Sequence, residues 1–144
     1  MRSPEVALCD TSVIVRFFHS YSDDEQHAAD ALYRRWWARR ADLLMLDLSV
    51  YEFINVLVRG LGWDGDRAAR SVGELFDLEL GLVSGSRDLA IACARTAAET
   101  GLSGYDAAFV AAARDLNVPL VTTDGRIIDR APDTAVSLLS MTGD

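Results

Sequence analysis

The chain has 144 residues, of which half are hydrophobic and a quarter are charged, as in an ordinary globular protein. We therefore expect one domain over residues 1–144, large enough to bury a core without disulfide or metal staples. The net charge of −8 disfavours broad attraction to nucleic acid, and the absence of any Lys excludes mechanisms that need a Schiff-base or P-loop lysine.

Short apolar runs alternate with helical patterns in the first half of the chain. Strands are predicted at residues 6–9 and 43–46, and helices at 13–18, 23–40, 50–58 and 64–77, where apolar residues recur at helical spacing. Ser49 and Glu52 have the spacing of a capping box at the start of the third of these helices.

The second half continues the same alternation. A weak strand is predicted at residues 80–83, helices at 86–100 and 103–116, and further strands at 118–121 and 136–139. Strands that alternate with helices are typical of a mostly parallel sheet with helices on both faces. The sequence therefore predicts the α/β fold class.

Four acids each follow a predicted strand or open a predicted helix: Asp10, Glu52, Asp106 and Asp124. Ligand sites in open α/β sheets lie at the carboxyl ends of the strands, so we expect these carboxylates to converge there. Two carboxylates about 5 Å apart repel by roughly 3 kcal/mol at an effective dielectric near 20. A hard cation such as Mg²⁺ or Mn²⁺ would relieve this repulsion, which makes phosphodiester chemistry the obvious function of such a site.

Each acid also has a purely structural interpretation. Asp10 and Asp106 are placed to belong to helix caps, Glu52 to pair with Ser49 in a capping box, and Asp124 to start a turn. Capping alone, however, does not require all four acids to lie at the same edge of a sheet.

Polar residues near the acids are candidates to orient the carboxylates. They are Thr11 and Ser12 beside Asp10, Asn55 one helical turn after Glu52, and Thr122 two residues before Asp124.

Several features predict a cytoplasmic location without a membrane partner. No apolar run approaches the roughly 18 residues of a membrane span, and the apolar run before Asp10 is too short for a secretory signal. Cys9 and Cys93 are far apart and follow no ligand spacing, so we interpret both as buried, reduced thiols.

The order of these pieces resembles the PIN domain family, and most closely the VapC-type ribonuclease toxins of bacterial and archaeal toxin–antitoxin pairs. The pieces are residues 10–12 after the first strand, the helix at 51–57, the stretch 103–107 and the strand exit at 121–124. Together they extend over nearly the whole chain. The resemblance implies a three-layer α/β/α fold with a five-stranded, mostly parallel sheet that forms a single nuclease domain.

The same resemblance implies an Mg²⁺- or Mn²⁺-dependent endoribonuclease. Its acidic quartet would be Asp10, Glu52, Asp106 and Asp124, with Asp10 and Asp106 as the strongest metal ligands. Metal-activated water would attack the phosphodiester, since neither His19 nor His27 is placed to act as a base. Asp129 is a further acid without an assigned role. The resemblance also implies a homodimer and inhibition by a small cognate antitoxin.

Trp37 stands in the run of Arg and Trp at residues 34–40, beside the apolar stripe that contains Trp36. One interpretation places Trp36 in the core and the Arg side chains in solvent. Our hypothesis is that Trp37, with Phe17, Phe18 or Tyr21, lines an apolar groove between the first two helices, where the resemblance places the antitoxin.

All 14 basic residues are Arg, the better bidentate phosphate donor. Arg16 and Arg126 are close in sequence to Asp10 and Asp124, and they are candidates for contacts with RNA phosphates.

Three other functions compete with the toxin hypothesis. Receiver domains and haloacid-dehalogenase-type phosphatases also place acids at strand ends, but they normally need a Lys, which this chain lacks. A non-catalytic PIN-like binding module would be favoured by the loss of an acid, and all four are present. A housekeeping nuclease of RNA maturation would have no antitoxin reading frame beside its gene.

Overall fold

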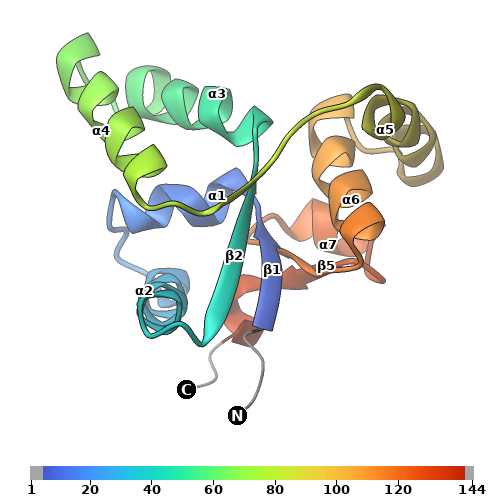
Figure 1. Cartoon of the computed structure of the whole chain (residues 1–144), viewed down its shortest axis with the longest axis horizontal. Coiled ribbons are helices and arrows are strands. Elements are labelled where there is room, and N and C mark those ends of the chain that lie inside the picture. The colour runs from blue at the N-terminus through green and yellow to red at the C-terminus, as the bar shows by residue number, and fades with distance from the viewer. Residues whose placement is uncertain (1–4, 142–144) are drawn as a thin grey trace.

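The computed structural model describes residues 5–141, which form a central sheet flanked by helices (Figure 1). The strands are β1 (Glu5–Cys9), β2 (Ala41–Leu46), β3 (Gly81–Val83), β4 (Leu120–Thr122) and β5 (Ala135–Ser137). The α-helices are α1 (Thr11–Ile14), α2 (Asp24–Trp37), α3 (Leu48–Asn55), α4 (Gly65–Asp77), α5 (Arg87–Thr100), α6 (Gly104–Leu116) and α7 (Gly125–Arg130). Three short turns complete the set: the 3₁₀ turns η1 (Val15–Phe17) and η3 (Leu138–Met141), and the π-helical turn η2 (Val56–Gly60).

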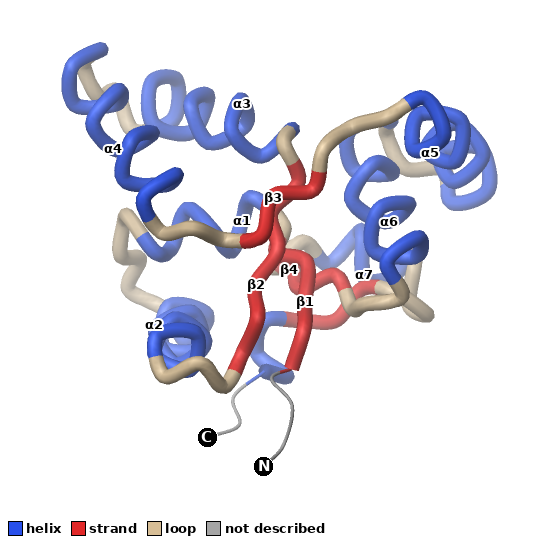
Figure 2. The backbone as a smooth tube through the Cα atoms, in the orientation of Figure 1, coloured by secondary structure: helices blue, strands red, loops and turns tan. Residues whose placement is uncertain are grey.

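The sheet is parallel throughout, and its strand order is β3-β2-β1-β4-β5. Figure 2 shows the strands in the middle of the fold with helices on either side. Alternate side chains of β1 enter different cores, as the twofold repeat of a strand requires. Ala7 and Cys9 pack with α1 to α4, whereas Leu8 packs on the opposite face with α5 to α7. The predicted three-layer α/β/α fold with a five-stranded parallel sheet is therefore confirmed.

The bounds of two predicted strands in the C-terminal part of the chain were wrong. The strand expected at residues 118–121 begins at Leu120, because Pro119 has no N–H to donate to a sheet ladder. The strand expected at 136–139 ends at Ser137 and turns into η3. Helix α7 was not predicted, since six residues that begin with Gly125 give too short a pattern to detect.

The first and third predicted helices also differ from expectation. After Asp10 the chain makes only one α-helical turn before it tightens into η1. Helix α3 begins at Leu48, with Asp47 at the N-cap and no side-chain hydrogen bond there. Ser49 therefore lies inside the helix, and the predicted capping box with Glu52 is wrong.

The cysteines are both free, but only one is buried. Cys9 is fully buried in the sheet, where burial and the adjacent Asp10 raise the pKa of its thiol to about 12. Cys93 is partly exposed, and its thiol donates to the Gly104 carbonyl at 3.1 Å. The prediction of a buried thiol was therefore wrong for Cys93. Among residues 5–141, no helix has both the length and the apolarity needed to cross a bilayer.

Candidate active site

The predicted acids gather where the connections of the sheet change direction. The chain leaves β1 toward β2 on one side, while β4 pairs with β1 on the other side. Such a switch point opens a crevice beyond the carboxyl ends of the strands. Asp10 follows β1 directly, and Thr122 is the last residue of β4.

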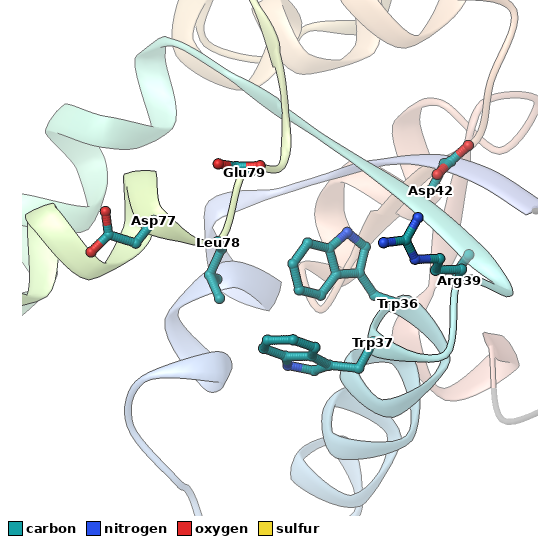
Figure 3. A pocket seen from close by; sticks show the side chains of 8 residues that line it. Trp36, Trp37, Arg39, Asp42, Asp77, Leu78 and Glu79 are labelled. Carbon is teal, nitrogen blue, oxygen red and sulfur yellow. The ribbon is translucent and has the colours of Figure 1, made fainter.

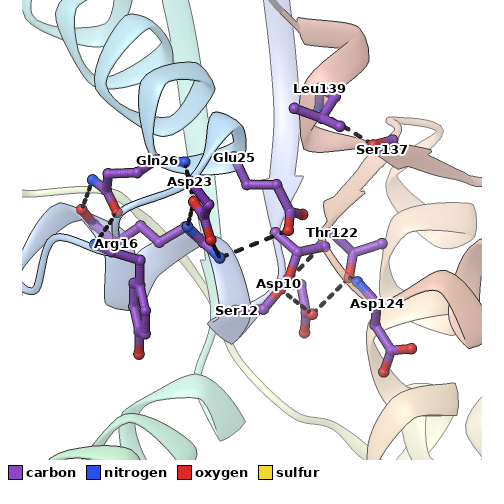
Figure 4. A network of polar contacts seen from close by, with 12 residues as sticks. Asp10, Ser12, Arg16, Asp23, Glu25, Gln26, Thr122, Asp124, Ser137 and Leu139 are labelled. Atoms are coloured by element: carbon purple, nitrogen blue, oxygen red, sulfur yellow. Dashed lines mark hydrogen bonds and ion pairs between the residues drawn. The ribbon is translucent and has the colours of Figure 1, made fainter.

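Asp10 is almost fully buried, with 7% of its surface exposed. Its Oδ2 accepts hydrogen bonds from the hydroxyls of Ser12 and Thr122, each at 2.8 Å (Figure 4). Burial raises the pKa of Asp10, the two hydroxyls oppose this rise, and the charge of Asp124 adds to it. Asp10 occupies the N-cap position of α1 but makes no side-chain capping bond there. Capping therefore does not explain its carboxylate.

Glu52 is held by Thr11, the residue that follows Asp10. Thr11 donates its hydroxyl to Glu52 Oε1 at 2.6 Å, and it lies 2.9 Å from the buried hydroxyl of Ser49. Because a hydroxyl has one hydrogen, Ser49 must be the donor to Thr11. Burial raises the pKa of Glu52, and the charges of Asp10 and Asp106 raise it further against the hydrogen bond from Thr11.

We expect Thr11→Val to lower cleavage or metal affinity about 10- to 100-fold, the usual effect of losing a group that orients a ligand. The change removes the hydrogen bond to Glu52 but preserves the shape of the side chain. Thr11→Ser restores the hydroxyl and should recover most of the loss. Activity and metal titration of both variants check the effect, and a Thr11→Ser variant as weak as Thr11→Val would contradict it.

Asp106 lies in the first turn of α6, which is fixed by its own cap. Ser103 accepts the Asp106 N–H at 3.1 Å, so the predicted cap exists but uses the backbone of Asp106. Burial raises the pKa of the Asp106 carboxyl, and the charges of Asp124 and Asp10 raise it further. The hydroxyl of Ser103 and the charge of Arg126 act in the opposite direction.

Asp124 has both a structural and an electrostatic role. Its Oδ1 accepts the Arg126 N–H at 2.9 Å and so caps α7, a role that replaces the simple turn expected from the sequence. Its own N–H donates to the Thr122 hydroxyl at 3.0 Å. Since that hydroxyl also donates to Asp10, Thr122 connects the two acids.

The four carboxylates are therefore coupled, although they come from four distant segments. The charge of Asp124 raises the pKa of Asp10. The charges of Asp10 and Asp106 raise the pKa of Glu52, and those of Asp124 and Asp10 raise the pKa of Asp106. Their oxygens fit a hard divalent cation in donor chemistry. As they stand, no three His, Cys, Asp or Glu side chains within residues 5–141 are arranged to enclose a metal ion. The donors are present without a finished coordination sphere.

The remaining polar candidates differ in their contacts. Ser12 donates to Asp10 and accepts the Thr123 N–H at 3.2 Å, so it joins the two strand ends. Asn55 is exposed and makes no side-chain hydrogen bond within the described part of the chain, so its support of Glu52 stays a prediction. Asp129 is also exposed, on α7.

Ser49 has a role in the site that was not predicted. The signal lay in its spacing, because residues three apart on a helix share a face. Ser49 and Glu52 both meet Thr11 on that face of α3.

The two candidate Arg residues are not equally free. Arg16 makes a bidentate ion pair with Asp23 at 2.7 and 3.2 Å, and its guanidinium lies 4.7 Å from the ring centroid of Tyr21. Arg126 is exposed on α7 and donates to the Gly101 carbonyl at 3.1 Å. Both phosphate contacts stay predictions, and Arg126 is the more accessible of the two.

The predicted aromatic groove between the first two helices stays a prediction. Trp37 has 62% of its surface exposed and borders a pocket of about 520 Å³ with Trp36, Leu78 and charged residues (Figure 3). The ring centroids of Phe17 and Tyr33 lie 5.3 Å apart. Tyr33 in turn contacts Trp37, with ring centroids 6.1 Å apart. Phe18 instead packs against the buried Phe53, so it does not line this pocket.

Solved structures of other proteins share this fold. Their TM-scores are 0.67 for PAE2754 from Pyrobaculum aerophilum, 0.68 for a toxin–antitoxin complex from Klebsiella pneumoniae, and 0.66 for Mycobacterium tuberculosis VapC20, a sarcin–ricin loop cleaving toxin. The identities are 21%, 18% and 18% in the same order. The matches cover 97%, 92% and 85% of this chain and 93%, 97% and 93% of those chains. At such identities the likeness concerns the fold alone.

Sequence comparison identifies the family. No curated protein matches the chain. The family model described as the PIN domain matches residues 7–133, which include all four acids and most of the sheet. PIN domains are generally nucleases. This chain belongs to the PIN domain family.

Proposed function

We propose that the chain is a divalent-cation-dependent endoribonuclease and the toxin of a toxin–antitoxin pair. The observation that carries the proposal is the gathering of Asp10, Glu52, Asp106 and Asp124 at the switch point of a PIN-family sheet, where neighbouring acids raise the pKa values of Asp10, Glu52 and Asp106. The titles of the Klebsiella and Mycobacterium structures, a toxin–antitoxin complex and an RNA-cleaving toxin, support the finer assignment.

Asp10 and Asp106 would hold the cation, and Glu52 and Asp124 would complete the site. A bound Mg²⁺ or Mn²⁺ supplies Lewis acidity and lowers the pKa of water. The hydroxyls of Ser12 and Thr122 both donate to Oδ2 of Asp10, so no described side chain donates to its Oδ1. This arrangement fixes the carboxylate.

The histidines do not compete for the role of general base. His19 packs edge-to-face against Tyr21 and Trp63, with ring centroids 4.9 and 6.4 Å apart. His27 is exposed on α2. The acid cluster is therefore the better candidate for the chemistry.

The partner proposal follows from the same family membership. A small antitoxin would bind near α2, where Trp37 offers an exposed ring, and the toxin would form a homodimer. A short reading frame beside the gene would distinguish this case from a housekeeping nuclease.

The test is cleavage of a mixed pool of structured RNAs by antitoxin-free protein in Mg²⁺, Mn²⁺ or EDTA. We expect cleavage with either metal, none in EDTA, and none by Asp106→Asn, whose backbone cap on Ser103 is preserved. Cleavage that persists in EDTA or in Asp106→Asn would reject the acid site. A folded wild type that binds Mn²⁺ but cuts no RNA would reject the ribonuclease assignment.

A further inference from the structure

A second cavity borders the acid cluster and is not used by the proposed chemistry. It has a volume of about 230 Å³ and is lined by Ser12, Val15, Arg16, Tyr21, Val56 and Thr123. Ser12 forms part of its wall and at the same time donates to Asp10. A group bound in this cavity would therefore lie next to the reacting atoms.

One wall of the cavity is a flat pair formed by Arg16 and Tyr21. The Arg16 guanidinium lies 4.7 Å from the centroid of the Tyr21 ring. Asp23 holds this guanidinium through two hydrogen bonds at 2.7 and 3.2 Å (Figure 4). The pair is therefore fixed before any ligand arrives.

Gln26 fixes the backbone of the same pair. It is 3% exposed, its amide donates to the Arg16 carbonyl at 2.8 Å, and its Oε1 accepts the Tyr21 N–H at 3.1 Å. A buried side chain that holds both partners reduces the entropy lost when a ligand binds to them.

The other walls combine apolar groups with hydroxyls. Val15 and Val56 provide apolar contacts, and Ser12 and Thr123 provide polar ones. Within residues 5–141 the Thr123 side chain makes no hydrogen bond, so its hydroxyl is available to a ligand. A flat aromatic and guanidinium surface with hydroxyls at its border suits a planar ring that has a polar edge.

We propose that this cavity binds one unpaired nucleobase of the RNA beside the scissile phosphate. The base packs against the Arg16–Tyr21 pair, and Thr123 contacts its edge. A base within a duplex is stacked and cannot enter, so the bound base must be unpaired. This inference rests on the proposed ribonuclease function and adds the side chains that hold the base beside the cleaved bond.

The first experiment replaces the ring while keeping apolar bulk. Tyr21→Leu should raise KM for a single-stranded RNA about 5- to 150-fold, the range for loss of one stacked base, with a smaller change in kcat. Tyr21→Phe keeps the ring and should remain near wild type. Phe76→Leu, the same kind of change at an exposed aromatic of α4, is the matched control.

The second experiment measures binding without cleavage, by fluorescence anisotropy in the Asp106→Asn background. Bases are removed one at a time along the RNA. One such removal should weaken binding to Asp106→Asn but not to the Asp106→Asn/Tyr21→Leu double variant. Thr123→Val should change the preference among bases. Equal sensitivity to base removal in both proteins, or no RNA binding at all, would overturn the inference.

The outcomes separate this inference from the proposed function. Cleavage by wild type without the coupling to Tyr21 would leave the nuclease intact and remove the base pocket. The coupling without any cleavage would do the reverse. Loss of binding to a partner protein in Tyr21→Leu, with RNA binding unchanged, would assign the pocket to protein recognition and overturn the inference.

Discussion

Asp10→Asn is expected to lower the rate of RNA cleavage by at least about 10²- to 10³-fold and to stabilise the metal-free protein. Asparagine keeps an oxygen that can accept from Ser12 and Thr122, but it carries no charge. Because burial raises the pKa of Asp10 in the folded state, its ionised form is favoured less there than in the unfolded chain. Removing the charge should therefore increase the free energy of unfolding at pH 7.

Thermal unfolding in EDTA measures this gain, and about 1 kcal/mol corresponds to about 2–4 °C in Tm. The wild type itself should gain stability as the pH falls from 7 toward the raised pKa of Asp10, because protonation removes the buried charge. Mn²⁺ should raise the Tm of wild type and have little effect on Asp10→Asn. A variant that is less stable than wild type in EDTA would show that the ionised carboxylate stabilises the fold.

Phe109→Ala is expected to cause the largest loss of stability among single changes in α6, about 3–5 kcal/mol. Phe109 is 1% exposed and packs with Leu8 of β1 and Leu120 of β4, so its removal leaves a cavity between helix and sheet. The loss should lower Tm by roughly 6–20 °C.

Tyr105→Ala is the control for Phe109, since it lies on the same helix with 67% of its surface exposed. We expect its free energy of unfolding to change by no more than about 0.5 kcal/mol. Urea denaturation of the two variants gives the comparison. A cost below about 1 kcal/mol for Phe109→Ala would mean that α6 does not depend on this contact.

The sequence was informative where one strong local rule decided the outcome. Asp10 follows a buried strand, and parallel strands bring their carboxyl ends to one edge, so its meeting with Thr122 could be predicted. The alternation of strand and helix patterns predicted the sheet and its two helical layers.

The errors arose where a distant contact outweighed a local pattern. Ser49 has the spacing of a cap, but its hydroxyl donates to Thr11, which is 38 residues away. Phe18 as a groove residue and Arg16 as a phosphate contact stay predictions, although each already contacts another side chain, Phe53 and Asp23.

The hydrogen bond from Thr122 to Asp10 spans 112 residues, and this separation governs when the enzyme can first exist. A chain growing on a ribosome can pair β1 with β2 early, yet it lacks Asp106, Thr122 and Asp124 until most of it has been made. Closing so distant a contact belongs to the late and slow part of folding. A chain that stops before residue 106 lacks two of the four acids, so we expect an active nuclease only when synthesis is nearly complete.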